Sequence, residues 1–390
     1  MGDRAKGFVT GDWSRIHRDR RFRPWTPLLA FCSAIYGIGV RLRLGMYETG
    51  ILTGKHLPGF VLSIGNLTAG GTGKTPAVVM LARWAVSQGL RAAVLSRGYG
   101  AQGHEDVCEV SDGHGEYVDV QMAGDEPSLI ARAIPEIPVI VSRSRHRAGM
   151  YAYEKFGSDV YILDDGFQHL QVERNLNLVL MDATDPFGNG HLLPWGPLRE
   201  PLNQLRRADA FILTRFNRGN NAGGRVPVIK RTVEEDSSHA MTAAKKTLAL
   251  LKERFPSKPV FYADHCPDEV IFPATGEAHD AGFLKGRRII AFAGIAHPEY
   301  FKELLGALGA EVVEFRGFRD HCAFTGKDLE DMIHAKESGG ADYLLTTEKD
   351  WMRIAAFAPN YGDLAYLRIR FSLLPGQDGL FRMILNDLGK

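Results

Sequence analysis

The chain has few cysteines and little net charge, two features that would otherwise point to a particular class of protein. Its 390 residues include four cysteines, Cys32, Cys108, Cys266 and Cys322, and none of them forms a Cys-x-x-Cys pair. This spacing supports neither a zinc knuckle nor a disulfide framework, and it favours a reducing compartment. The formal net charge is only +1, so we expect no nucleic-acid partner. No internal repeat or low-complexity tract is evident.

Long apolar runs are also scarce. Residues 25–40 carry no formal charge, but 16 residues of helix extend only about 24 Å, short of a hydrocarbon core of about 30 Å. Five arginines between residues 14 and 23 precede this run, and Arg41 and Arg43 follow it. We expect a basic extension over 1–24 and a helix over 25–46 that lies in a membrane interface. A core helix of a soluble domain and a marginal single span remain the alternatives.

What is present is a regular alternation of short apolar strands and helices. Apolar residues make up 45% of the chain and charged residues 24%, as in globular proteins. Strands are predicted near 61–64, 91–96, 138–141, 160–163, 176–181 and 210–213, with helices between several of them. This pattern predicts an α/β fold whose parallel sheet has helices on both faces. Residues 107–120 are predicted to form a small hairpin that turns at Asp112 and Gly113.

The length of the chain indicates two domains. A polar, glycine-rich break at 217–225 separates the first α/β series from a second, smaller one. We therefore expect a nucleotide-binding domain over 47–220, a second α/β domain over 226–375, and a C-terminal helix over 376–390 that packs on the first domain. Ligands tend to bind at the carboxyl ends of such strands.

The most specific motif is the glycine-rich loop at 65–76, which lies between a predicted strand and a predicted helix. This is the context of a phosphate-binding loop (P-loop) of an NTPase-like fold. Its glycines let backbone N–H groups point at an anion, and the helix start adds partial positive charge. The candidate nucleotide-binding residues are Thr68, Ala69, Gly70, Gly71, Thr72, Gly73, Lys74 and Thr75. Thr68 stands where the standard pattern has glycine, and a glycine-rich turn without ligand is the alternative.

Acidic residues follow the fourth strand of this series. Asp164 and Asp165 come directly after residues 160–163, where a P-loop protein usually holds Mg²⁺, and the Thr75 hydroxyl is a further Mg²⁺ ligand. Two adjacent carboxylates resist ionising together, so a bound cation resolves their repulsion. A strand-end cap is the alternative interpretation.

Other polar groups are ambiguous by themselves. Asp125 precedes a predicted helix, which is typical of an N-cap, and Asp320 with His321 is an ordinary loop pair. Arg97 and the cluster from Arg143 to Arg147 follow strands, where they are suited either to phosphate or to solvent.

Taken together, these segments resemble the tetraacyldisaccharide 4′-kinase (lipid A 4′-kinase) family of Gram-negative bacteria. The matching segments are residues 65–76, 96–100, 124–127, 164–169, 193–201, 320–321 and 347–350. Thr68 agrees with the loop of this family. The resemblance covers nearly the whole chain after about residue 24.

The resemblance implies ATP- and Mg²⁺-dependent phosphorylation of the 4′-hydroxyl of a tetraacylated glucosamine disaccharide 1-phosphate, forming lipid IVA. It also implies that the enzyme acts at the cytoplasmic face of the inner membrane, bound peripherally or anchored by a single helix. The implied fold has two α/β domains joined by a two-stranded link. By the same resemblance Asp125 is the base, paired with His321. The remaining implied site residues are Lys74, Thr75, Asp164, Asp165, Arg145, Gln168 and His169, with Arg97 and Glu200 as weaker assignments.

Two other functions compete with this one. A soluble P-loop kinase or ATP-dependent ligase acting on a small metabolite explains the loop but gives residues 15–46 no purpose. A regulatory nucleotide switch is the other alternative, although the chain has no Asn-Lys-x-Asp element that would read guanine.

Overall fold

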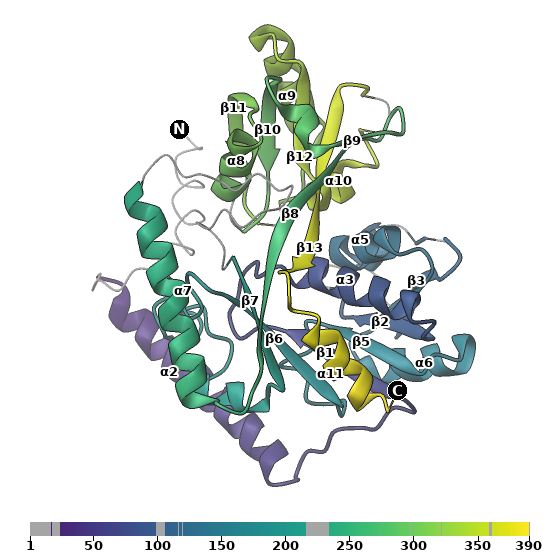
Figure 1. Ribbon diagram of the computed structural model, residues 1–390, viewed down its shortest axis with the longest axis vertical. Coiled ribbons are helices and arrows are strands. Elements are labelled where there is room, and N and C mark those ends of the chain that lie inside the picture. The colour runs from purple at the N-terminus through teal and green to yellow at the C-terminus, as the bar shows by residue number, and fades with distance from the viewer. Residues whose placement is uncertain are drawn as a thin grey trace.

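The computed structural model describes residues 17, 24–98, 106–115, 117–118, 120–215, 234–296, 298–320, 322–358 and 361–389. The predicted boundary at 217–225, most of the basic extension, and His321 lie outside these ranges. Figure 1 shows an elongated molecule in which two α/β regions lie one above the other.

The first region is built on a parallel sheet, as predicted. Its strands are β1 (Phe60–Gly65), β2 (Ala92–Ser96), β3 (Cys108–Asp112), β4 (Pro138–Val141), β5 (Val160–Asp164), β6 (Leu176–Asp182) and β7 (Ala210–Thr214). In space they follow the order β7-β6-β1-β5-β2-β4-β3, and β3 alone among these runs antiparallel to its neighbour. Every residue of β1 is buried, because helices cover both faces of the sheet.

Alternate residues of the strands face opposite helix layers. Leu62 and Ile64 of β1 pack in one core with α3 (Lys74–Ser87) and α5 (Asp125–Ala133), whereas Val61 packs on the other side with α6 (Arg145–Phe156). Helix α7 (Glu234–Arg254) covers β6 and β7 on the face opposite α3. The predicted fold class is therefore confirmed.

The second region repeats the α/β pattern on a smaller scale. Its parallel strands are β10 (Arg288–Ala293), β11 (Glu311–Gly317), β12 (Tyr343–Thr347) and β13 (Leu364–Leu373). Helix α8 (Pro298–Ala307) packs on one face, and α9 (Gly326–Gly339) and α10 (Glu348–Ile354) pack on the other. Four short elements complete the two regions: α4 (Val120–Ala123), β9 (Glu277–Asp280) and the 3-10 turns Leu202–Arg207 and Ala281–Leu284.

Two long strands join the regions. Strand β8 (Val260–Phe272) pairs parallel with β7 at its start and antiparallel with β13 along most of its length. Because of this link, the thirteen strands among the described residues form one continuous sheet (Figure 1). After β13 the chain returns to the first region, where Phe381 of α11 (Gly379–Asp387) stacks on Trp84 with ring centroids 5.3 Å apart.

The predicted hairpin over 107–120 is wrong. Among the described residues of this segment, which leave out 116 and 119, only the first arm is a strand, β3, and it pairs with β4. A single backbone bond of 3.1 Å, from Val118 N to Val110 O, joins the two arms before α4 begins.

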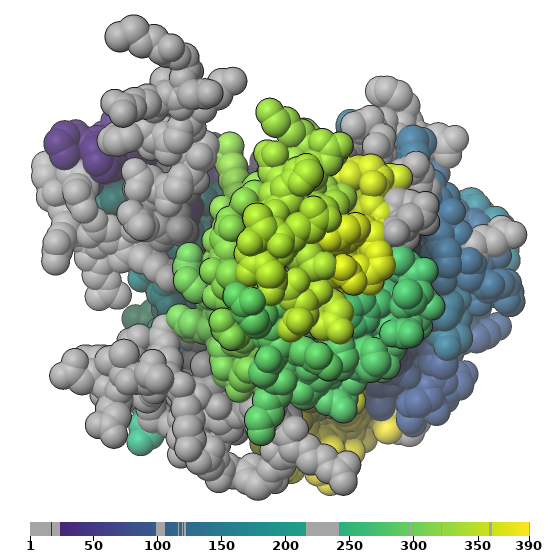
Figure 2. Space-filling view, turned by 90° about the horizontal axis from the view of Figure 1, so that it is seen from above, coloured from purple at the N-terminus to yellow at the C-terminus, as the bar shows by residue number. Residues whose placement is uncertain are grey.

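The second region leans over the first at helix α5. Helix α10 packs against α5. Seen from above, the green-to-yellow surface of the second region lies beside the blue surface of the β3–α5 segment (Figure 2). This contact closes one side of the space between the regions.

Candidate functional site

The glycine-rich loop leads from the end of β1 to the first residue of α3. Gly73 is the N-cap of α3 and adopts the left-handed conformation with φ 84°. No side chain caps this helix, so its first N–H groups are available to an anion. A Cβ at Gly73 would also collide with the His265 imidazole, which gives glycine a second reason to stand there.

The first half of the loop is held in place by residues 197–199. Ala69 N donates to Pro197 O at 2.7 Å, and Arg199 N donates to Leu67 O at 2.9 Å. Thr68 forms an isolated bridge with Leu198 in the same contact. The segment 193–201, which the family resemblance includes, therefore fixes the first half of the loop through these backbone hydrogen bonds.

Lys74 is held by two groups at the carboxyl edge of the sheet. Its Nζ donates to Asn66 Oδ1 at 3.2 Å and lies 3.7 Å from Asp165 Oδ1. Arg199 donates to the other oxygen of Asp165 at 2.7 Å. Burial disfavours the charged form of Asp165, but the combined charges of Lys74 and Arg199 outweigh it and lower the pKa of this carboxyl. Asp165 is therefore ionised at neutral pH.

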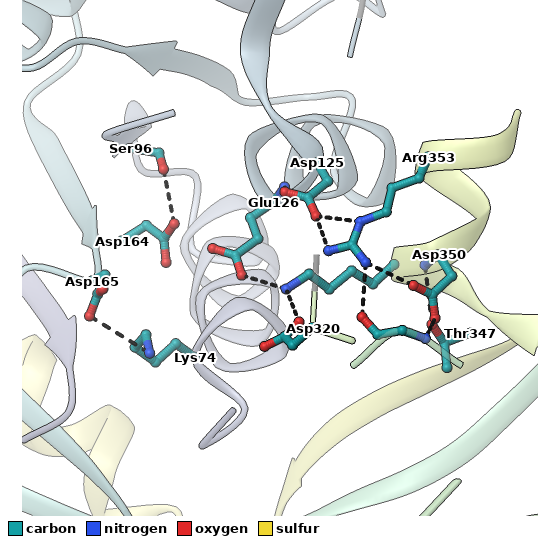
Figure 3. Close-up of polar contacts among 12 residues, drawn as sticks. Lys74, Ser96, Asp125, Glu126, Asp164, Asp165, Asp320, Thr347, Asp350 and Arg353 are labelled. Atoms are coloured by element: carbon teal, nitrogen blue, oxygen red, sulfur yellow. Dashed lines mark hydrogen bonds and ion pairs between the residues drawn. The ribbon is translucent and has the colours of Figure 1, made fainter. Parts of the chain in front are cut away.

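Asp164 has a different environment from its neighbour. It is buried, and the Ser96 hydroxyl donates to its Oδ2 at 3.0 Å. Burial, with the negative charges of Glu126 and Asp165, raises the pKa of Asp164 to about 6. Figure 3 shows Asp164 and Asp165 on the same side of the site as Lys74. The two acids thus differ: the charges of Lys74 and Arg199 outweigh the effect of burial on the pKa of Asp165, whereas the charge of Lys74 does not outweigh it at Asp164.

The other predicted residues of this edge also gather here. Arg145 is buried, and its Nη2 donates to the backbone oxygen of Asp164 at 3.0 Å, while its Nε and Nη1 have no hydrogen-bond partner among the described residues. Burial lowers the pKa of Arg145 to about 10. Burial and neighbouring arginines lower the pKa of His169 to about 3, so this imidazole is neutral. Gln168 Nε2 donates to Asn66 O at 2.9 Å and ties the turn after β5 to the loop.

Asp125 lies across the site, at the first residue of α5. Both Nε and Nη2 of Arg353 donate to its Oδ2, at 2.9 and 2.6 Å. Next to it, Lys349 Nζ lies 3.0 Å from Glu126 Oε1 and 3.6 Å from Asp320 Oδ1. Arg353 and Lys349 belong to α10, so their pairs with Asp125 and Glu126 join the two regions, and Figure 3 shows Arg353 beside Asp125.

Helix α2 (Thr26–Glu48) presents an unusual face to solvent. Leu28, Phe31, Ile35, Ile38 and Leu42 are each 56–65% exposed and recur at helical spacing on one side. By length and composition this helix could also cross a membrane.

The opposite face of α2 carries polar groups that bind the first region. Ser33 donates to Leu192 O and Tyr36 to Arg199 O, each at 2.9 Å, and Arg43 donates to Gln168 O at 2.8 Å. Glu200 is buried nearby, in an ion pair with Arg207 and 3.9 Å from Arg43. The helix is therefore no core helix, since its apolar side faces outward.

One cavity of about 1000 Å³ extends from the P-loop past the acids at the end of β5 to Asp125 and to helix α2. Its lining includes the loop from Ala69 to Thr75, both acids after β5, Asp125, Arg97, and Tyr36 and Arg43 of α2. Thr68, which bridges to Leu198, is not part of that lining. Among the described residues no group of three or more His, Cys, Asp or Glu side chains could hold a metal ion by itself.

Sequence reasoning missed several residues that organise the site. Asn66 and Ser96 are ordinary strand-end residues in the sequence, and Arg199 belongs to the segment 193–201, whose pattern predicts no role for it. Arg353 has no motif of its own. A signal was available in residues 347–350, because Thr347 caps a short helix that begins at Glu348, and this helix presents a basic residue, Arg353, three positions after Asp350.

Comparisons with known proteins agree with this geometry. A family model described as tetraacyldisaccharide-1-P 4′-kinase matches residues 25–389. A relative from Syntrophus aciditrophicus (strain SB), named tetraacyldisaccharide 4′-kinase, is 41% identical over 353 residues, which is 90% of each chain. Another of that name, from Geobacter sulfurreducens, is 40% identical over 84% of each chain.

A solved structure of LpxK from Aquifex aeolicus in complex with ATP is similar throughout. It superposes with a TM-score of 0.69 at 30% identity, and the match covers 93% of this chain and 99% of that one. The extent of these matches, over both regions and the loop, shows that the chain belongs to the tetraacyldisaccharide-1-P 4′-kinase family.

Proposed function

We propose that this protein transfers the γ-phosphoryl group of ATP to the 4′-hydroxyl of a tetraacylated glucosamine disaccharide 1-phosphate, forming lipid IVA. The names of its relatives and the ATP complex of a similar protein support this activity. The observation that carries it is the shared cavity, which is lined both by the P-loop and by α2. A phosphate donor and an acceptor that comes from a lipid surface would meet there.

The P-loop residues would hold the triphosphate. Backbone N–H groups from Gly70 to Gly73, with the uncapped start of α3, favour phosphate oxygens, and Lys74 would neutralise the outer phosphates. Asn66 and Asp165 keep the Lys74 ammonium at the mouth of the loop. Arg145, two of whose buried nitrogens find no partner in the described part of the chain, and neutral His169 would line the same space and supply further donors.

The residues present fit Mg²⁺. Asp164 is a buried carboxylate whose pKa is raised by burial and by nearby acids despite the opposing charge of Lys74, and the Thr75 hydroxyl lines the same cavity. Carboxylate and hydroxyl oxygens are the ligands this ion takes beside phosphate oxygens and water. Asp164 and Thr75 would hold the ion, and Asp165 would position it while orienting Lys74. When bound, Mg²⁺ neutralises charge on the phosphoryl oxygens.

Asp125 would accept the proton of the acceptor hydroxyl, with His321 as its proposed partner. Phosphoryl transfer depends mainly on alignment and charge neutralisation, so a carboxylate base is sufficient. Asp125 lines the cavity from the side opposite the acids after β5, which leaves room between them for the reacting groups.

We also propose that the apolar face of α2 binds the cytoplasmic surface of the inner membrane. The helix lies flat against the protein through Ser33, Tyr36 and Arg43, so its exposed face can enter the interface while it stays docked. A transmembrane orientation would break these three contacts. The acceptor, which carries four acyl chains, would then be presented beside the mouth of the cavity.

Transfer of radiolabelled γ-phosphate from ATP to a defined disaccharide lipid tests the activity, with the labelled position mapped on the product. We expect label at the 4′-oxygen and turnover that requires Mg²⁺. Label on a small soluble acceptor instead, with the lipid unmodified, would favour the metabolite kinase or ligase. Hydrolysis of ATP unaffected by lipid would point to a nucleotide switch.

A further inference from the structure

We propose that Arg353 is a positioning residue that aligns the Asp125 carboxylate for proton abstraction, and that this alignment requires α10 to be docked on α5. The inference rests on the proposed function, because it takes Asp125 as the base.

The geometry of the pair fixes the carboxylate. Nε and Nη2 of Arg353 converge on one oxygen, Oδ2 of Asp125, at 2.9 and 2.6 Å. Both side chains are about one-tenth exposed, so water does not replace these bonds easily. The guanidinium is planar and rigid, and two of its donors on one acceptor restrict rotation of the carboxylate. The second oxygen, Oδ1, accepts from Glu126 N at 3.1 Å.

Arg353 is itself held by the second region. Its Nη1 donates to Gly294 O and to Asp350 Oδ1, each at 2.9 Å. Asp350 is fully buried, and its Oδ2 accepts from Gly294 N at 2.9 Å and from the Thr347 hydroxyl at 2.7 Å. The orientation of the guanidinium is therefore set by the start of α10 and by the turn after β10.

The charges around Asp125 explain why a cation is needed there. Among the described residues, the carboxylates of Asp125, Glu126, Asp320 and Asp350 meet the cations of Lys349 and Arg353. Acids thus outnumber cations in this cluster. Although burial disfavours its charge, the Asp125 and Asp350 carboxylates raise the pKa of Arg353 and keep it protonated. Removing Arg353 would leave Asp125 among like charges.

The two members of the pair belong to different regions. Asp125 and Glu126 begin α5, whereas Lys349 and Arg353 lie on α10 (Figure 3). The base is consequently aligned by a helix that is more than two hundred residues distant in sequence. Catalysis at the P-loop region then depends on contact with the second region.

A double-mutant cycle on the full-length protein tests this inference. Arg353→Gln is expected to lower kcat roughly 10- to 100-fold, the cost of misplacing a reacting group by about an ångström, with the KM for ATP within about threefold. In an Asp125→Asn background the same change is expected to cost less than about twofold, because nothing remains to be aligned. Arg353→Lys keeps the charge but loses the planar fork, so we expect an intermediate rate.

The controls separate alignment from general damage. Arg316→Gln removes a partly exposed ion pair with Glu314 in the same region, outside the cavity, and is expected to leave kcat unchanged. Equal losses from Arg353→Gln in both backgrounds, with a matching fall in Tm, would overturn the inference and assign Arg353 a structural role.

Two further outcomes distinguish this inference from the proposed function. If wild-type protein labels the lipid and Asp125→Asn is fully active, the inference fails while the function stands. If wild-type protein labels no lipid, both fail.

Discussion

The exposed face of α2 gives a quantitative prediction about membrane binding. Deleting the helix would also uncover the surface around Leu192 and Arg199 that it contacts, so substitution is the cleaner perturbation. We choose Phe31→Gln, Ile35→Gln and Ile38→Gln together, since all three side chains point outward and are 56–65% exposed. Glutamine is a good helix former, so the docked face is expected to persist.

The size of the expected loss of membrane binding follows from the apolar area that these side chains expose. Full burial of a large apolar side chain is favourable by about 1.5–3 kcal/mol. Transfer of the exposed 56–65% of each of these three side chains into the membrane interface therefore favours binding by roughly 1–2 kcal/mol per side chain. Three substitutions therefore weaken binding by about 3 kcal/mol or more, which is at least roughly 100-fold in the partition coefficient. Vesicle flotation with anionic lipid vesicles measures this coefficient directly.

Two comparisons make the measurement decisive. Glutamine at Val86, Tyr153 and Val313, which are exposed singly on other elements, removes apolar surface without touching α2 and is expected to change partitioning little. Turnover of a detergent-dispersed acceptor by the α2 variant is expected to stay within about twofold of wild type. A partition coefficient within about threefold of wild type would refute the assignment of this face to the membrane.

Three further predictions concern the cavity. Lys74→Ala is expected to lower turnover at least about 100-fold in the phosphate-transfer assay, because it removes the cation at the loop, and activity within threefold of wild type would contradict this. Asp125→Asn is expected to reduce kcat far more than ATP affinity measured by calorimetry; equal losses would assign Asp125 to nucleotide or metal. For Asp164, burial raises the folded-state pKa to about 6 from 3.8, so the folded state favours the protonated form. The contribution of protonated Asp164 to the free energy of unfolding is therefore complete below about pH 3.8 and is lost as the pH rises through 6. Asp164→Asn is therefore expected to raise the Tm of nucleotide-free protein at pH 8 and not at pH 4; an unchanged Tm at pH 8 would show that the buried charge is already compensated.

The sequence predicted the P-loop region well because its signals are local. β1 is buried on both faces and reads as an apolar run, and the glycines that follow it include one at positive φ, next to the helix start. The acids at 164 and 165 follow a strand that pairs with β1, so the order of the sheet alone brings them to Lys74.

The link between the regions was harder to predict from residue patterns. Strand β13 was not expected, although Arg368 and Arg370 alternate there with apolar residues. The two-stranded link came from the family resemblance alone. The predicted hairpin is a related case, since the strand β3 finds its partner in β4, which follows it by more than twenty residues, and this pairing leaves no local turn signal.

The alignment of Asp125 could not have been predicted from local sequence. Its partner Arg353 is 228 positions away, and neither residue lies in a pattern that names the other. Asp125 at the start of a helix resembles an ordinary cap, yet no side chain caps α5. Long-range ion pairs of this kind leave no periodicity, so only the folded arrangement reveals them.

The register of the two joining strands has a mechanical consequence. Pairing between β8 and β13 is irregular between Leu367 and Ile369, opposite the stretch from Pro267 to Val270. A bulge bends the strand that carries it and increases its local twist. Arg368 and Asp268, beside this irregularity, line the large cavity. The bend between the two regions therefore lies in the wall of the cavity, so a ligand that fills the cavity would contact the joint that sets the angle between them.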